Sequence, residues 1–219
     1  MTSKMLLAAF TAGAVTSAAT AELVGVVGGQ TNVLLDFATI QSATGLEFAG
    51  VSDGVITPGN LGADSVAFAI TSPASASAPT TFNYDSSDFF GTFGGTIEHR
   101  GSISFTGSAD VTLGNFTIDY LSGLDTFQVV TNLGFAGLSL FDVDITDASP
   151  LESTFDVRGD LLISNAFAIA LIDLGLASTD LTGADVGDAF IQGFNQPVPA
   201  PGALAVLACT GLVARRRRG

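Results

Sequence analysis

The sequence predicts a mainly β domain, a β-sandwich or a jelly-roll-like fold with one short helix, between residues 22 and 196. Short apolar runs alternate with polar residues at a period of two, and clusters of Gly, Asn, Asp, Ser and Pro separate these runs. Only one stretch has helical spacing. Many short strands with a single helix are typical of sandwiches and jelly rolls. A β-solenoid is the alternative, although no fixed-period repeat is present.

The first expected strands are runs in which apolar residues alternate with polar or small ones. Two such runs occur early in the domain: Val33, Leu35 and Phe37, then Val66, Phe68 and Ile70. In TIEHRGSISF, alternation places one set of residues on a single face: Ile97, His99, Gly101, Ile103 and Phe105. His99, the only histidine of the chain, therefore lies on an apolar face. We interpret it as a hydrogen-bonded histidine of the core or of a sheet edge.

Two later runs change phase, which predicts a β-bulge or a tight bend at each change. In ADVTLGNFTIDY, Val111 and Leu113 share a face, but the apolar residues that follow Gly114-Asn115 are out of phase with them. In LSLFDVDI, the inward set changes between Leu140 and Phe141. Both runs are expected to be strands that bend within their length.

The last part of the domain combines a regular strand with the one expected helix. The run TFDVRGDLLI keeps its phase, with an inward set of Phe155, Val157, Leu161 and Ile163. Its outer face carries Arg158 between Asp156 and Asp160, a charge ladder that supports a strand. In NAFAIALIDLGLA, helical spacing relates Phe167, Ala170, Leu171 and Leu174. This spacing predicts a short helix.

The domain is strongly acidic. The chain of 219 residues has a net charge of −14, but all 21 acidic residues lie between Glu22 and Asp188, together with only Arg100 and Arg158. The domain alone therefore has a net charge of −19. Such a surface repels phosphate backbones, so the composition excludes nucleic-acid binding. It favours solubility and can attract cations.

The domain carries no recognisable catalytic set, and we predict no catalytic residue. A Ser-His-Asp triad would need His99 to be exposed beside an activated serine, and no G-x-S-x-G elbow is present. One histidine and no cysteine in the domain cannot supply the usual zinc ligands. No phosphate-binding glycine loop is present. A secreted hydrolase built on two carboxylates is the enzymatic alternative.

Calcium is the one cofactor that the carboxylates could bind, because it takes six to eight oxygen ligands. FDVDITD contributes Asp142 and Asp144 on one strand face and Asp147 in the following turn. TGADVGD contributes Asp185 and Asp188 in a glycine-rich bend. Neither segment matches an EF-hand loop or a calcium-binding nonapeptide repeat, so solvent-facing aspartates are the simpler interpretation.

The first 21 residues are predicted to be a secretory signal peptide. Lys4 makes a positive beginning, residues 5–15 form a short apolar run, and Ala19-Thr20-Ala21 supplies the small-residue pattern at which signal peptidase cleaves. We therefore expect an exported protein that begins near Glu22. Cys209 is the only cysteine, so the exported domain has no disulfide.

Residues 197–219 differ from the domain before them. Pro199, Ala200 and Pro201 precede an apolar run, residues 203–214, which as a helix would be about 18 Å long. A hydrocarbon core is about 30 Å thick, so this is a marginal membrane span. The chain then ends in a basic cluster, Arg215, Arg216, Arg217 and Arg218, which would stay on the cytoplasmic side.

The proline turn, the short span and the arginine cluster together resemble the PEP-CTERM sorting signal, in a variant where Ala200 stands between the two prolines. The resemblance covers residues 198–219, and it implies that the chain is a substrate of an exosortase-type processing enzyme. It also implies transient membrane insertion through this helix. Sorting would then bring the protein to the cell surface or the extracellular matrix. Proteins with this signal are often associated with exopolysaccharide and biofilms, which suggests exopolysaccharide as a partner.

These observations lead to three functional hypotheses. The first is an exported, non-enzymatic protein of the cell surface or the biofilm matrix with a structural role. The second is a calcium-dependent polysaccharide-binding or adhesion module. The third is the secreted hydrolase.

Overall fold

The computed structural model describes residues 23–121 and 126–199, which form twelve strands and three short helices. The strands are β1 (Leu23–Leu35), β2 (Leu46–Val51), β3 (Val66–Ile70), β4 (Asn83–Asp85), β5 (Ile97–Arg100), β6 (Ser102–Gly107), β7 (Val111–Gly114), β8 (Thr117–Leu121), β9 (Thr126–Thr131), β10 (Leu138–Pro150), β11 (Thr154–Ile163) and β12 (Asp185–Pro197). The helices are α1 (Phe37–Thr44), α2 (Phe89–Thr92) and α3 (Asn165–Asp173). The predicted mainly β class is confirmed.

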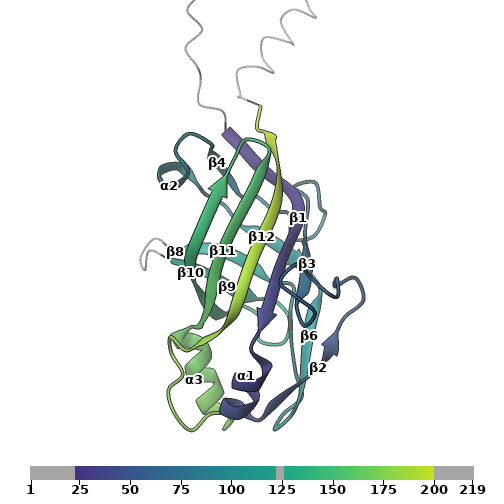
Figure 1. Ribbon diagram of the computed structural model, residues 1–219, viewed down its shortest axis with the longest axis vertical. Helices are drawn as coiled ribbons and strands as arrows, with labels where there is room; N and C mark the ends of the chain where they lie inside the picture. The colour runs from purple at the N-terminus through teal and green to yellow at the C-terminus, as the bar shows by residue number, and fades with distance from the viewer. Residues whose placement is uncertain (1–22, 122–125, 200–219) are drawn as a thin grey trace, which may run out of the picture.

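Eight of the strands close into an antiparallel barrel in the order β12-β11-β10-β9-β8-β5-β3-β1 (Figure 1). The barrel closes because β1 pairs with β12 as well as with β3, in a register that runs from Val24 opposite Pro197 to Leu35 opposite Gly187. The predicted sandwich, jelly roll and solenoid are therefore wrong. A bulge between Val26 and Gly28 lets β1 follow the curvature of the wall.

Glycine allows β1 and β12 to approach closely at one point of this seam. Gly29 has φ of 125°, and a Cβ atom on it would collide with the carbonyl oxygen of Gln192. A side chain at this position would therefore disturb the pairing that closes the barrel.

A smaller sheet in the order β2-β6-β7 extends from the barrel wall. The chain leaves the barrel at Gly101, with φ of 111°, and returns to it after Asn115, with φ of 48°. The segment TIEHRGSISF is thus two strands in two sheets and not one continuous strand. Four of the five residues of its predicted inward set are nevertheless buried, all but the half-buried Gly101, because the chain turns at that glycine without changing which face is apolar. The bend predicted at Gly114-Asn115 is confirmed.

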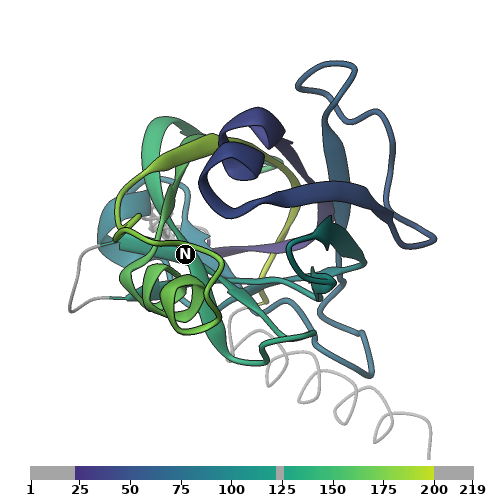
Figure 2. The same ribbon diagram turned by 90° about the horizontal axis from the view of Figure 1, so that it is seen from below.

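Two helices close one end of the barrel, as the view from below shows (Figure 2). The predicted helix is confirmed as α3, and the Ser164 side chain caps it by accepting a hydrogen bond from the Phe167 amide at 3.1 Å. The expected strand through Phe37 is wrong from that residue onward. Asp36 accepts a hydrogen bond from the Thr39 amide at 2.9 Å and so begins α1, which ends at the left-handed Gly45.

The hydrophobic core lies inside the barrel as two clusters. The first lies against α1, α3 and the smaller sheet, and is mostly aliphatic. The second lies towards β4 and α2, at the opposite end in Figure 1, and is rich in aromatic rings. We call these the helical end and the aromatic end of the barrel. The alternation predicted for β11 is confirmed, since Phe155, Val157, Leu161 and Ile163 are all buried.

Candidate functional site

An apolar cavity of about 180 Å³ lies inside the barrel, and it is the principal candidate for a functional site. Barrel strands and both large helices supply its wall, which is apolar almost throughout. Characteristic lining residues are Ile40, Val129, Leu140, Val143, Val157 and Leu171. Val129 packs against both core clusters, so it lies between the two ends of the barrel.

His99 lies on the inner face of β5 beside this cavity, 2% exposed. Its Nδ1 atom is 3.1 Å from the carbonyl oxygen of Phe116, and its Nε2 atom is 2.7 Å from the Thr31 hydroxyl. Because a carbonyl oxygen only accepts, the neutral ring donates from Nδ1, and Nε2 accepts from Thr31. Burial lowers the pKa of His99 to about 4, so the ring is neutral at pH 7.

These contacts confirm that His99 is a hydrogen-bonded histidine of the core. A hydrolase would need it exposed beside a serine, but its ring is buried and its hydroxyl partner belongs to Thr31. Thr31 is 68 residues away in the chain and could not be paired with His99 from the sequence. Its position on β1 follows only from the pairing of β1 with β3 and of β3 with β5.

The aromatic end is closed by packed rings. Phe155 lies against Phe82, Tyr84 and Phe89, with ring centroids 5.2, 5.5 and 5.7 Å away. The Tyr84 hydroxyl donates to the carbonyl oxygen of Leu151 at 2.8 Å and accepts from the Asn195 amide at 2.7 Å. Burial raises the pKa of Tyr84 to about 12, so its phenol stays protonated.

The outer face of β10, β11 and β12 carries a row of carboxylates. Asp144 pairs with Asp160, and Asp160 with Asp188, so that three aspartates stand side by side on adjacent strands. Partial burial and then the neighbouring Asp185, Asp188 and Asp144 raise the pKa of Asp160. Asp160 was predicted on this face but was not among the expected calcium ligands.

The other expected calcium ligands have separate surroundings. Asp142 accepts a hydrogen bond from the Gln128 amide at 2.9 Å, and Asp147 stands opposite Arg158 in the ladder. Asp185 accepts from the amide of Gly187 at 3.1 Å. Within residues 23–121 and 126–199, no group of three or more His, Cys, Asp or Glu side chains is arranged to hold a metal ion. Calcium binding stays a prediction.

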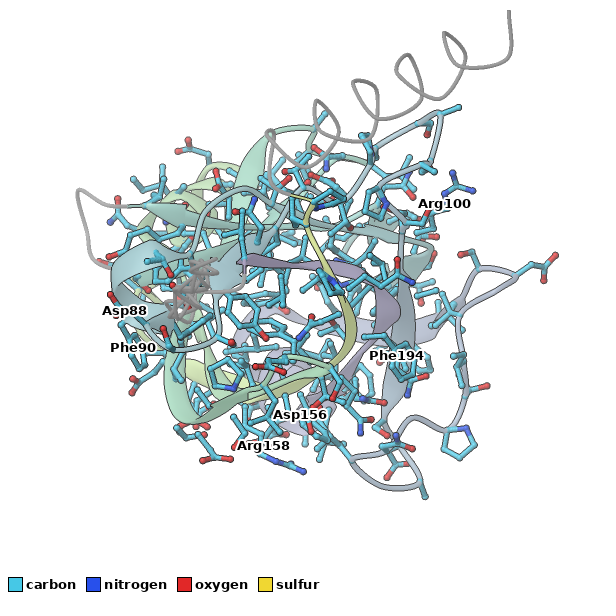
Figure 3. All side chains as sticks on the ribbon, turned by 90° about the horizontal axis from the view of Figure 1, so that it is seen from above. Asp88, Phe90, Arg100, Asp156, Arg158 and Phe194 are labelled. Carbon is cyan, nitrogen blue, oxygen red and sulfur yellow. The ribbon has the colours of Figure 1, made fainter. Side chains whose placement is uncertain are left out.

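Arg158 is the cation of this outer wall, and it points away from the barrel (Figure 3). Its guanidinium carbon lies 3.7 Å from the centroid of the Phe190 ring, a cation–π contact between β11 and β12. The guanidinium thus lies outside the apolar interior, and the charges of this wall are on its outer face.

The predicted processing residues lie largely outside the described residues. This holds for Ala19, Ala21, Ala200, Pro201 and the arginines at 215–218. Pro199 is described and exposed, and it lies two residues after the end of β12. No helix within the described part of the chain is long and apolar enough to cross a membrane. The expected membrane helix, residues 203–214, lies outside that part.

Neither a family model nor a curated protein matches the chain. Two solved structures from Corynebacterium glutamicum are similar to it. One is the C-terminal domain of HtaA, with a TM-score of 0.55 and 12% identity over 79% of this chain and 99% of that domain. The other is the heme-binding protein HtaB, with a TM-score of 0.53 and 12% identity over 80% of this chain and 97% of HtaB. The chain therefore has the closed-barrel fold of these two proteins.

Proposed function

We propose that this chain is an exported, non-enzymatic protein of the cell surface or the extracellular matrix, sorted through its C-terminal segment and serving a structural role. The observation that carries the proposal is the position of the two ends of the described body. The Val198 amide donates to the Leu23 carbonyl oxygen at 2.7 Å, so both ends lie side by side at the aromatic end of the barrel (Figure 1). Cleavage near Ala21 and near Pro201 would leave every strand of the barrel intact.

A double substitution, Pro199→Ala with Pro201→Ala, tests the sorting step. We expect it to block processing, so that a larger, membrane-associated form accumulates. Pro150→Ala, in the β10–β11 hairpin, is the matched control and should be processed normally. Intact mass spectrometry of the extracellular and membrane fractions measures the result. Secretion of the double variant at the mature mass of the unaltered protein would contradict the proposal.

The non-enzymatic part of the proposal is supported by the state of His99. Burial and two hydrogen bonds keep it away from solvent and from any serine hydroxyl in the described residues. The similar HtaB is named for binding and not for a reaction. Screening the purified protein for turnover of glycans and esters tests this part. Turnover that survives the removal of His99 and of the outer aspartates would identify carboxylates elsewhere in the protein as the catalytic groups.

Calcium-dependent adhesion is tested by melting the protein with calcium and then with a chelator. A ligand that binds the native state must raise the Tm, so a shift at millimolar calcium would support the second hypothesis. The absence of a shift would remove it.

Heme is the ligand for which the similar HtaB is named, and the barrel interior of this chain, with His99 and Tyr84, does not fit it. The interior cavity of about 180 Å³ lies below the roughly 300–1,000 Å³ of pockets for drug-sized ligands. His99 uses both ring nitrogens in hydrogen bonds, and the Tyr84 phenol is protonated and doubly hydrogen-bonded. We therefore derive no heme chemistry for this chain. Titration with hemin should give no new Soret band, and a saturable band would contradict this conclusion.

A further inference from the structure

We propose that the barrel interior binds one small, uncharged, apolar molecule of about the size of benzene. This inference goes beyond the proposed function, because it concerns the cavity and does not depend on export, sorting or processing. It rests on the size of the cavity, the chemistry of its wall and the internal hydrogen bonds of the polar pair beside it, Thr31 and His99.

The size of the cavity sets the size of the molecule. An engineered cavity of about 150 Å³ lined by Leu, Ile and Phe is known to stay dry and to bind benzene or xenon. The cavity here is about 180 Å³, with a wall of the same residue types, such as Leu140, Val129 and Ile40. A benzene-sized molecule fits this volume, whereas a porphyrin or a fatty acid does not.

The chemistry of the wall sets the class of the molecule. Among the described residues, the cavity wall holds no carboxylate, and its one charged residue, Arg158, places its guanidinium over Phe190 on the outside, on the same face as Asp156 and Asp160. Burying an unpaired charge costs more free energy than the apolar contacts of this wall could contribute. Dispersion contacts and the removal of apolar surface from water are the interactions that this wall provides.

Thr31 and His99, the polar pair beside the cavity, need no hydrogen bond from a ligand. Thr31 donates to Nε2 of His99, and Nδ1 of His99 donates to the Phe116 carbonyl oxygen, so the polar hydrogens of this pair are used. Water in the cavity would find few partners, because an ordered water needs two to four of them. The cavity is therefore a dry, apolar space that an apolar molecule can fill.

The test uses the full chain and two probes, benzene and xenon. With benzene at about ten times its dissociation constant, we expect the Tm to rise by roughly 3–6 °C. Val129→Phe takes up cavity volume and should abolish most of this shift. Val130→Phe is the matched control, because the next residue of β9 points to the opposite face and should leave the shift unchanged. Xenon should give a saturable NMR shift with the same dependence on the two variants.

A second variant keeps the inference testable if Val129→Phe fails to fold. Val143→Ala enlarges the cavity from β10, and the shift with a larger probe, para-xylene, should increase relative to the unaltered protein. No shift with benzene or xenon, or an equal shift in Val129→Phe, would overturn the inference. A Soret band with hemin but no benzene shift would overturn it in favour of heme. The processing assay on Pro199 and Pro201 is independent of all these outcomes.

Discussion

The inner and the outer face of the wall formed by β10, β11 and β12 differ in almost every physical property. The inner face carries Phe155, Val157 and Leu161, each at most 6% exposed. The outer face of the same strands carries Asp144, Asp160 and Asp188 in one row. One backbone therefore supports an apolar interior and a repulsive acidic surface. The inner face therefore stabilises the folded protein by burying apolar side chains, and repulsion among the carboxylates of the outer face reduces that stability.

The largest expected effect is a truncation at the aromatic end. Phe155→Ala removes a ring, 2% exposed, that contacts three other rings, and it should lower the free energy of unfolding by about 3–5 kcal/mol. Asp156→Ala, the next residue on the outer face, should change it by no more than about 0.5 kcal/mol. Urea unfolding of both variants measures the comparison, and equal effects would refute it.

Acidification should act next most strongly, through His99. Its pKa is about 4 in the folded protein against about 6.5 in the unfolded chain, so unfolding takes up a proton between these values. The neutral ring contributes stability that is complete above pH 6.5 and is lost as the pH falls towards 4. The loss should reach about 3 kcal/mol. The chain has no other histidine, so a free energy of unfolding that stays flat between pH 7 and 5 would contradict this assignment.

The hydroxyl of Thr31 gives a smaller effect at the same place. Thr31→Val keeps the shape of the side chain but leaves Nε2 of His99 without its donor, which should cost about 1–3 kcal/mol. Thr31→Ser keeps the hydroxyl and should cost less. Chemical denaturation at pH 7.5 compares the two variants. If valine proves as stable as serine, the Thr31–His99 hydrogen bond contributes nothing.

The smallest effect is expected on the outer face and has the opposite sign. Partial burial and the neighbouring carboxylates raise the pKa of Asp160, so its charged form is disfavoured in the folded protein. Asp160→Asn should therefore raise the Tm slightly at low ionic strength, and 1 M salt should reduce the gain, because it shortens the Debye length to about 3 Å and so screens the repulsion by the neighbouring carboxylates. Asp147→Asn, opposite Arg158, is the control and should give no gain. A lower Tm for Asp160→Asn would show that this carboxylate is paired and not repelled.

Much of the local structure could be predicted from periodicity. Alternation identified the inward set of β11, and the phase changes marked the bend after Gly114 and the bulge between Ser139 and Phe141. Alternation misled at Phe37, because it continues the pattern of β1. The signals that begin and end α1, the cap at Asp36 and the left-handed Gly45, were present in the sequence.

The closure of the barrel and the partner of His99 could not be predicted in this way. A period of two is shared by sandwiches and barrels, and it is the pairing of β1 with β12 that distinguishes the barrel. Thr31 and His99 come into contact because β3 lies between their strands. This neighbourhood follows from the order of strands in the sheet and cannot be seen in the spacing of residues along the sequence. The buried position of His99 was predictable, whereas the cavity beside it depends on how eight strands pack together.

The seam between β1 and β12 also determines when the domain can fold. Val24 pairs with Pro197, so the first strand must wait for the last one before the ring of hydrogen bonds is complete. Contacts of such large sequence separation form slowly, because chain entropy opposes the closure of long loops. During synthesis, the edges of β1 and β11 that pair with β12 stay exposed until β12 emerges. If the C-terminal segment is sorted as proposed, its membrane-held stage would keep β12 next to the strands it must join, and sorting and folding would share one final step.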